Sequence, residues 1–436
     1  MSERKLEQSE RIWRRAEALI PAGTQTLAKG PGQWMRGVAP KYLARGRGAH
    51  VWDVDGNEYI DLAMAIGPLS LGYTWPSVDE AIRAQLADGI TFSLMHPLEV
   101  EVAELLREMV PGAEMVASPR RAATSPARRY AWPAPSPAGT PSSPAGITGG
   151  TTGTWPRPTA TRASRRPPRA CRTPSSTPTG PPWRRPSTTT PRASSWNRWS
   201  SSSRRRASWR VCALTRERGA LLVFDEMWTG FRVALGGAQQ RFGVTADLAC
   251  FSKAIANGMP LSALTGRAEV MRLCERDVFF FTTFGGEALS LAAARATLRE
   301  MRASDVPARL EAQGKKLQDG YRSIAREHGM AYTDCIGLPC RTLVTFDASA
   351  GEPLVLKSFV QQEMIERGIL WGGTHTLSLS HDDADIARVL QAYREVLPLL
   401  DEAVRAGDVR ARLRGEPLEP VFRRTGNFHT KPRPRP

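Results

Sequence analysis

The chain has no apolar run long enough to cross a membrane and no hydrophobic segment near its start. Its first residues, MSERKLEQSERIWRR, are charged, so we expect no secretory signal. The six cysteines fit neither a metal-binding spacing nor a disulfide framework, and we expect no metal site. A reducing, cytoplasmic setting is therefore expected. At 436 residues the chain is long enough for two domains around a large core.

Acidic residues are missing from one part of the chain, and this absence explains its net charge. The formal charge is +17, a value typical of nucleic-acid-binding proteins. Residues 117–210, however, contain 18 arginines and no Asp, Glu or Lys, which leaves the rest of the chain at −1. The same segment has no Leu, Val, Phe or Met, and Ile147 is its only isoleucine. Such a composition buries too little apolar area to offset the entropy of ordering, so we expect 117–210 to be irregular or disordered.

Three hypotheses account for this basic segment. It is a disordered linker that binds nucleic acid, a low-complexity insertion without function, or a stretch translated out of frame from GC-rich DNA. The nucleic-acid hypothesis predicts lysine among the arginines and aromatic residues, or a known binding module, and the segment has no lysine and no such module. A long structureless insertion inside a compact domain is also uncommon.

The genetic code tests the third hypothesis. Read one base earlier, residues 194–199 can become Val-Val-Leu-Glu-Pro-Val, and the Glu is fixed because Trp has a single codon and Asn begins with AA. In the same frame residues 147–154 can become Tyr-His-Gly-Trp-His-Asp-Trp-Tyr. Residues 117–132 can give a string that contains Gly-Ser-Asp-Val-Thr. We therefore predict a frameshift over 117–210, with a compensating shift near Arg210.

Outside that segment, residues 221–232 read LLVFDEMWTGFR. An apolar run that ends in two acids predicts a buried parallel strand with Asp225 at its C-terminal end. Ligands gather at that end of an α/β sheet. For this motif alone, acids that simply end a strand are the more ordinary interpretation.

Residues 247–260, DLACFSKAIANGMP, predict a short strand that delivers Lys253 into a turn of small residues. A lysine in a crowded site loses its water, which lowers the pKa of the amine and frees it as a nucleophile. An ordinary surface lysine is the alternative. Asp225 and Lys253 are expected on neighbouring strands, and together they favour a functional site.

Residues 281–288, FTTFGGEA, predict a turn that opens the alanine-rich helix after them. The Thr283 hydroxyl and free backbone N–H groups at such a helix start suit a phosphate. A threonine that merely caps the helix is the simpler alternative.

These motifs resemble the class III, fold-type I pyridoxal phosphate (PLP) aminotransferases, and within them glutamate-1-semialdehyde 2,1-aminomutase and its relatives. The resemblance runs from about Ile20 to Val396, apart from the basic segment. It includes residues 48–61, GAHVWDVDGNEYID, and residues 67–73, GPLSLGY. The three strings recovered in the shifted frame resemble the family's missing middle.

The resemblance implies an α/β fold with a large, mostly parallel sheet domain and a smaller α+β C-terminal domain. It implies that Lys253 forms the internal aldimine with PLP and moves a proton during amino transfer. Asp225 would pair with the pyridine nitrogen, because a protonated ring is the better electron sink, and Met227 would pack on the ring. Thr283 resembles the threonine that reaches the phosphate of the neighbouring subunit, which implies a homodimer.

The same resemblance assigns the phosphate cup to the Gly-Ser-Asp-Val-Thr string and a ring-stacking aromatic to the Tyr of Tyr-His-Gly. Residues 122–125 and 146–147 occupy those places in the chain as written. Without the cup, we expect this chain to show no internal-aldimine absorbance.

The substrate is left open by departures from the aminomutase pattern. Residues 254–258 read AIANG where the aminomutase is Gly-rich, and residues 283–288 read TFGGEA in place of Thr-Leu-Ser-Gly-Asn-Pro. We predict a transaminase that acts on a small-molecule amino donor and acceptor, with the aminomutase proper as the alternative. Nucleic-acid binding through 117–210 is the alternative from another class.

The chain is expected to divide into an N-terminal segment (1–60, a helix and a short hairpin), a PLP-binding domain (61–305), a C-terminal domain (306–425) and a disordered tail (426–436). Residues 342–346 predict a strand, and the apolar spacing over 356–364 predicts a core helix that Gly368 closes. Arg341 is a candidate for a substrate carboxylate, although a solvated arginine is the simpler interpretation. His375 and His381 are expected to be structural.

Overall fold

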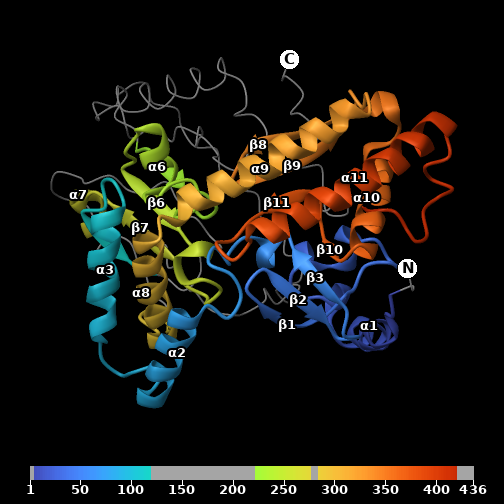
Figure 1. Cartoon of the computed structure of the whole chain (residues 1–436). Coiled ribbons are helices and arrows are strands. Elements are labelled where there is room, and N and C mark those ends of the chain that lie inside the picture. The colour runs from blue at the N-terminus through green and yellow to red at the C-terminus, as the bar shows by residue number, and fades with distance from the viewer. Residues whose placement is uncertain (1–3, 119–220, 276–282, 420–436) are drawn as a thin grey trace, which may run out of the picture.

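The computed structural model describes residues 4–118, 221–275 and 283–419, and Figure 1 shows how their helices and strands are arranged. The helices are α1 (Glu7–Leu19), α2 (Pro76–Asp88), α3 (Pro97–Met109), α6 (Gly237–Phe242), α7 (Ala268–Met271), α8 (Ala288–Ala303), α9 (Val306–Glu327), α10 (Pro353–Glu366) and α11 (Asp383–Ala406). None of these helices is long and apolar enough to span a membrane. The basic segment and the tail after residue 419 lie outside the described residues, so the expectation that they are disordered remains a prediction.

The first sheet has the strand order β4-β7-β6-β5, with β4 (Met115–Ala117), β5 (Val223–Asp225), β6 (Leu248–Phe251) and β7 (Ala263–Gly266). β5 and β6 are parallel, and β7 runs antiparallel to both β6 and β4. Three of these four strands share one direction, although only one of the three pairings, β5 with β6, is parallel. The expected adjacency of the Asp225 and Lys253 strands is also confirmed, since Asp225 pairs with Cys250 across β5 and β6.

Helices α2 and α3 pack against α8, and Figure 1 shows the three side by side. Alanine dominates α8 because it is the strongest helix former and its small side chain permits close helix contacts. Residues 291–294 of α8 are completely buried in the core. α8 also packs against residues 253–256, the turn that follows β6.

The second sheet joins the two ends of the sequence. Its order is β1-β2-β3-β10, with β1 (Leu43–Arg47), β2 (His50–Asp53), β3 (Glu58–Asp61) and β10 (Ile369–Leu370). The β2–β3 turn also caps α1, because the Asp55 carboxylate accepts hydrogen bonds from the backbone N–H groups of Gln8 and Ser9 at 2.6 and 3.0 Å. The N-terminal segment thus shares a sheet with the C-terminal part, a long-range pairing that local sequence patterns do not reveal.

The third sheet, β11-β9-β8, consists of β8 (Thr333–Leu338), β9 (Arg341–Phe346) and β11 (Thr374–Thr376). α9 and α10 pack on it, and α11 packs against both helices. The predicted strand over 342–346 is confirmed as β9, and the predicted core helix is confirmed as α10. The four apolar side chains of its predicted stripe are buried, and Gly368 follows the helix with φ +79°, a conformation that favours glycine.

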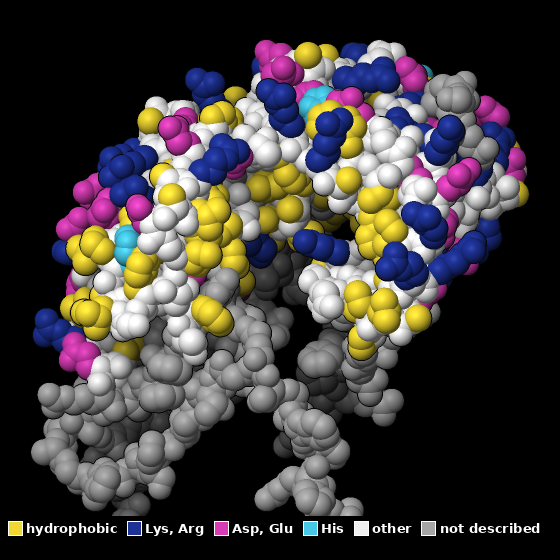
Figure 2. Space-filling model, turned by 90° about the horizontal axis from the view of Figure 1, so that it is seen from below, with side chains coloured by type: hydrophobic (Ala, Val, Ile, Leu, Met, Phe, Trp, Pro, Cys, Tyr) yellow, Lys and Arg dark blue, Asp and Glu magenta, His cyan; other side chains and the backbone are white. Residues whose placement is uncertain are grey.

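From below, the described residues arch around a hollow whose walls carry both hydrophobic and Lys or Arg side chains (Figure 2). The four described cysteines, Cys250, Cys274, Cys335 and Cys340, are free thiols.

Candidate functional site

Lys253 lies just beyond β6, as the first residue of a short 3-10 helix, η7 (Lys253–Ala256). Its backbone has φ +50°, a left-handed conformation that is uncommon outside glycine and typical of strained functional turns. The turn is held by Asn257, whose side chain accepts from Leu71 N at 3.1 Å and donates to Gly72 O at 2.9 Å. Two segments far apart in sequence therefore fix the position of Lys253.

The Lys253 side chain is half-buried, and its Nζ lies 5.4 Å from the centre of the Trp228 ring. Burial lowers the pKa of Lys253, the positive charges of Arg341 and Arg232 lower it further, and the Asp225 carboxylate opposes the shift. No carboxylate lies within ion-pair distance of Nζ among the described residues. The result is an amine displaced toward its neutral, nucleophilic form.

Asp225 ends β5 with an exposed side chain, and its carboxylate accepts a hydrogen bond from Met227 N at 3.1 Å. Met227 itself is half-buried. Across the sheet, burial and the Asp225 charge together raise the pKa of the Cys250 thiol to about 12. Asp225, Met227 and Lys253 thus lie at the same ends of two neighbouring strands, as predicted.

The adjacent acid, Glu226, has a different role. It is completely buried, and its carboxylate accepts hydrogen bonds from the Thr229 hydroxyl and from the backbone N–H groups of Ala238 and Gln239 at the start of α6. Burial raises the pKa of Glu226, although the hydrogen bonds from the Thr229 hydroxyl and from the two backbone N–H groups oppose the shift. Of the two acids in the motif, Glu226 is structural and Asp225 is the one that faces solvent.

Arg232 and Trp228 belong to the same motif, but sequence reasoning assigned them no role. The Arg232 guanidinium is buried and donates to Leu377 O at 2.8 Å, Gly67 O at 3.0 Å and Ser70 Oγ at 2.9 Å. Burial lowers the pKa of Arg232 to about 10. The only signal in the sequence was its place at the end of the motif, since its partners are more than 140 residues away.

Arg341 begins β9, and its guanidinium lies 4.2 Å from the centre of the Trp228 ring. The side chain is half-buried and its Nε is a buried atom without a hydrogen-bond partner. Burial lowers the pKa of Arg341. The interpretation of Arg341 as an ordinary solvated arginine is therefore wrong, because the C-terminal part of the chain folds over the Asp225 motif.

Thr283 is exposed in the turn before α8. The cap of α8 is Glu287, whose carboxylate accepts from the N–H groups of Leu289 at 2.8 Å and Ser290 at 3.2 Å. The alternative that Thr283 merely caps the helix is wrong, and these two N–H groups are already used by a carboxylate rather than left for a phosphate. The expected contact of the Thr283 hydroxyl with PLP stays a prediction. The expected phosphate cup and ring-stacking aromatic lie outside the described residues.

His375 and His381, which were predicted to be structural, are both buried. His375 shares hydrogen bonds with the hydroxyls of Thr342 and Tyr393, both at 2.7 Å, and burial lowers its pKa to about 3. His381 accepts from the backbone N–H of Ser378 at 3.0 Å, and burial lowers its pKa to about 4.

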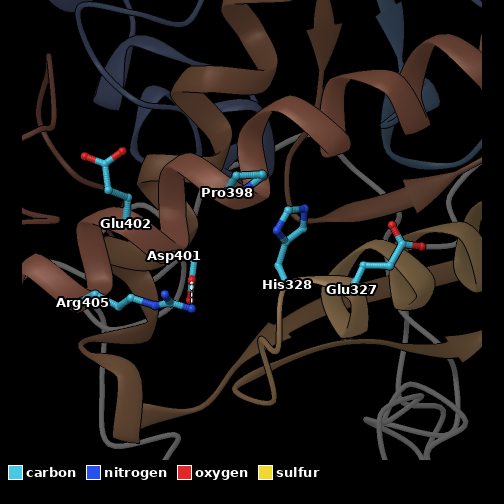
Figure 3. A pocket seen from close by; sticks show the side chains of 6 residues that line it. All are labelled: Glu327, His328, Pro398, Asp401, Glu402 and Arg405. Atoms are coloured by element: carbon cyan, nitrogen blue, oxygen red, sulfur yellow. Dashed lines mark ion pairs between the residues drawn. The ribbon is translucent and has the colours of Figure 1, made fainter.

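A surface depression of about 460 Å³ lies elsewhere, between the end of α9 and the second half of α11 (Figure 3). It contains an ion pair between Asp401 and Arg405 at 2.6 Å but none of the residues described above. The residues that the structure describes contain no cluster of side chains suited to a metal ion. The depression is lined by Glu327, His328, Pro398, Asp401, Glu402 and Arg405.

The sequence of this chain is similar to a known enzyme family and to two of its relatives. Residues 35–123 and 207–371 match the family Aminotransferase class-III, and the residues between the two blocks lie inside the basic segment. The chain is 31% identical over 442 residues to glutamate-1-semialdehyde 2,1-aminomutase of Roseiflexus castenholzii (strain DSM 13941 / HLO8), covering 92% of this chain and 99% of that protein. It is also 31% identical over 429 residues to the protein of that name from Sorangium cellulosum (strain So ce56), covering 89% and 96%.

Solved structures confirm the predicted fold class. The FumI protein of Sphingopyxis sp. MTA144, in its PLP internal aldimine form, superposes with a TM-score of 0.68 at 22% identity, covering 94% of this chain and 99% of that one. A glutamate-1-semialdehyde-aminomutase from Pseudomonas aeruginosa PAO1 gives a TM-score of 0.64 at 17% identity, covering 91% and 95%. None of these comparisons supports the nucleic-acid alternative. The chain belongs to the class III aminotransferases, whose cofactor is pyridoxal 5'-phosphate.

Proposed function

We propose that this gene encodes a transaminase similar to glutamate-1-semialdehyde aminomutase, in which Lys253 holds the cofactor. The observation that carries the proposal is the state of Lys253: half-buried, without a carboxylate partner among the described residues, and with a lowered pKa. An amine in this state attacks a carbonyl readily and can also accept a proton. Its place beside Asp225, at the ends of two parallel strands, is where α/β proteins bind cofactors.

The side chains at this edge fit one side of a pyridoxal ring. The exposed Asp225 carboxylate would receive the ring nitrogen, and Met227 would pack against the ring. Bound pyridoxal phosphate supplies an electron-withdrawing ring that stabilises negative charge on the substrate Cα. The Lys253 amine takes the proton from that Cα, for which its lowered pKa is suited.

We also propose that the enzyme is a homodimer in which Thr283 contacts the partner's cofactor. Large apolar side chains gather near this turn and are exposed: Ile90, Phe92, Leu94, Met95, Val100 and Phe284. The turn and this patch are joined, because Ala288 N donates to Ile90 O at 2.9 Å. A contiguous exposed apolar patch marks an association surface. Sedimentation is expected to show a dimer that dissociates when Met95 is changed to Glu, and a monomer before that change would contradict the proposal.

The substrate belongs to the small-molecule amino donors and acceptors, and we propose transamination rather than the aminomutase reaction. The support is the departure of residues 254–258 and 283–288 from the aminomutase pattern. An aminomutase proper rearranges glutamate 1-semialdehyde without a second substrate, whereas a transaminase requires an amino acceptor. Turnover of the semialdehyde alone would therefore favour the alternative. A cytoplasmic location is proposed on the free cysteines.

We propose further that residues 117–210 are read in the wrong frame, so that the chain as written lacks the phosphate cup and does not take up PLP. The test is to read the nucleotide sequence again across codons 110–215. If the gene is intact in the printed frame, the frameshift proposal fails. If a shift is found, the same gene with its frame restored yields what we call the frame-restored chain.

The experiment for Lys253 uses the frame-restored chain, incubated with PLP and compared with Lys253→Ala. The expected result is a visible absorbance band of bound cofactor that the substitution abolishes. Lys315→Ala is the matched control, because Lys315 is an exposed lysine paired with Asp319 at 2.6 Å. A band that survives in Lys253→Ala would contradict the proposed function.

A further inference from the structure

Three cations surround one aromatic ring at the candidate site. The guanidinium carbons of Arg341 and Arg232 lie 4.2 and 5.3 Å from the centre of the Trp228 ring, and Lys253 Nζ lies 5.4 Å from it. Each distance is within the range of a cation–π interaction. Gly67 leaves room for the ring, because a Cβ atom at that position would lie 2.4 Å from Trp228.

This cluster carries an excess of positive charge. None of the three cations has a carboxylate within 4.0 Å among the residues that the structure describes. Asp225 acts on Lys253 only at longer range, where its charge raises the lysine pKa against the effects of burial and of the two arginines. Cations removed from water without an anion are costly, so such a cluster is expected where a ligand supplies the negative charge.

Arg232 and Arg341 differ in how many of their hydrogen-bond donors are already used within the protein. Arg232 donates from both terminal nitrogens to Leu377 O, Gly67 O and Ser70 Oγ and leaves only its Nε without a partner, so it holds the site together. The Arg341 side chain makes no hydrogen bond or ion pair with any described residue, and its Nε is buried and unpaired. Buried donors of this kind require an explanation. The Arg341 guanidinium lies over the Trp228 ring, and its nitrogens donate to no described residue.

We propose that Arg341 is the specificity-determining residue that receives the carboxylate of the amino-acid substrate. The proposal rests on the proposed function, since it places the carboxylate at the Trp228 ring, whose centre lies 5.4 Å from the Lys253 amine. The planar fork of a guanidinium matches the two oxygens of a carboxylate and binds them bidentately. A carboxylate there compensates the charge of all three cations. Donors that lack the carboxylate leave Arg341 unpaired and are bound less well.

The first test does not require the cofactor. The full chain is titrated with glutarate by calorimetry, and so are its variants Arg341→Gln, Arg341→Lys and Arg83→Gln. Arg83 is the matched control, an arginine with 75% of its side chain exposed and a single ion pair to Asp79. We expect Arg341→Gln to weaken glutarate binding by about 10- to 100-fold, which corresponds to the loss of a charged hydrogen-bonding pair. Arg341→Lys keeps the charge but not the forked geometry, so its affinity for glutarate is expected to lie between those of the unsubstituted chain and Arg341→Gln. Arg83→Gln is expected to leave glutarate binding unchanged.

Three results of this titration would overturn the proposal. They are an absence of glutarate binding by the unsubstituted chain, equal binding by Arg341→Gln, and inorganic phosphate that binds as tightly as glutarate with the same dependence on Arg341. The last result would assign the site to a phosphate. Glutaramide, the neutral amide of glutarate, is expected to bind weakly and reports on shape without charge.

The second test separates the proposal from the proposed function. In the frame-restored chain loaded with PLP, Arg341→Gln is expected to raise the KM for glutamate by the same factor and to leave the KM for 1-phenylethylamine unchanged. An equal rise for both donors would overturn the role of Arg341. If the frame-restored chain fails to take up PLP, the proposed function is contradicted. If glutarate binding still depends on Arg341 in that case, the carboxylate site remains supported.

Discussion

Two regions of this protein bury polar side chains in opposite ways. In the C-terminal part, His375 lies between the hydroxyls of Thr342 and Tyr393 with both ring nitrogens bonded at 2.7 Å. At the end of β5 and β6, Lys253 and Arg341 have neither a hydrogen bond nor an ion pair among the described residues. His375 is completely buried and the two cations are half-buried, so both regions remove polar groups from water, and burial by itself does not separate a structural group from a functional one.

The difference lies in the partners. A buried polar group whose donors and acceptors are all used stabilises the fold, and its loss leaves its partners unpaired. A buried cation without a partner does not stabilise the fold, and is best explained by a ligand that completes it. The comparison therefore predicts that substitutions around His375 change stability, whereas substitutions around Trp228 change binding and catalysis.

The largest expected effect belongs to Lys253. In the frame-restored chain, Lys253→Ala is expected to lower the rate of amino transfer by at least about a thousandfold, because it removes both the nucleophile and the proton acceptor. The free energy of unfolding of the cofactor-free protein should change little. Urea unfolding and steady-state rates measure the two quantities. A loss of stability without a loss of rate would contradict the assignment of Lys253 to function.

The two adjacent acids separate the regions within a single motif. Asp225→Asn is expected to lower the transamination rate by about 10- to 100-fold without a change in stability, because its exposed side chain accepts only one backbone hydrogen bond. Glu226→Gln is expected to lower the free energy of unfolding by about 1–3 kcal/mol, because one of its oxygens becomes a donor facing the N–H groups at the start of α6. Paired urea titrations and rate assays decide this, and identical profiles for the two variants would contradict the assignment.

His375 predicts a dependence of stability on pH. Its pKa is lowered from 6.5 to about 3 in the folded state. Between these two pH values the imidazole is therefore protonated in the unfolded chain and neutral in the folded chain. This contribution is complete above pH 6.5 and is lost as the pH falls toward 3. Between pH 6 and 4 the free energy of unfolding of the unsubstituted protein should fall more steeply than that of His375→Gln, by up to about 1.4 kcal/mol per pH unit. Parallel curves over this range would show that His375 is already protonated in the fold.

The smallest effect is expected for the stability of Arg341→Met. Removing an unpaired buried charge gives up one cation–π contact but also its desolvation cost, so the free energy of unfolding should fall by no more than about 0.5 kcal/mol. The same measurement on Thr342→Val, which removes a partner of His375, is expected to show a loss of about 1–2 kcal/mol. A larger loss for Arg341→Met than for Thr342→Val would reverse the comparison.

Local patterns in the sequence were enough to predict several elements. The apolar stripe of α10, the β9 strand and the adjacency of β5 and β6 all follow from short-range periodicity and from motif order. Lys253 and Asp225 could be singled out because a lysine and an acid that end neighbouring strands meet at the same edge of a sheet. A structural role was also predicted for His375, which is buried.

Long-range contacts could not be predicted in this way. The stacking of Arg341 on Trp228 joins residues more than 100 positions apart, and the pairing of β3 with β10 joins the two ends of the chain. The capping of α8 by Glu287 was missed because Thr283 had the more usual capping side chain, whereas the helix begins later, at Ala288. In each case the contact is set by tertiary packing, and the local sequence pattern does not distinguish the residues that make it from others that could.

The most direct test of the account is a mass map of the chain as written and of the frame-restored chain, each incubated with PLP, reduced with borohydride and digested. The frame-restored chain is expected to carry the cofactor on the peptide that contains Lys253, and the chain as written is expected to carry none. Cofactor on another lysine of the frame-restored chain would contradict the assignment of Lys253. Cofactor on Lys253 of the chain as written would contradict the frameshift.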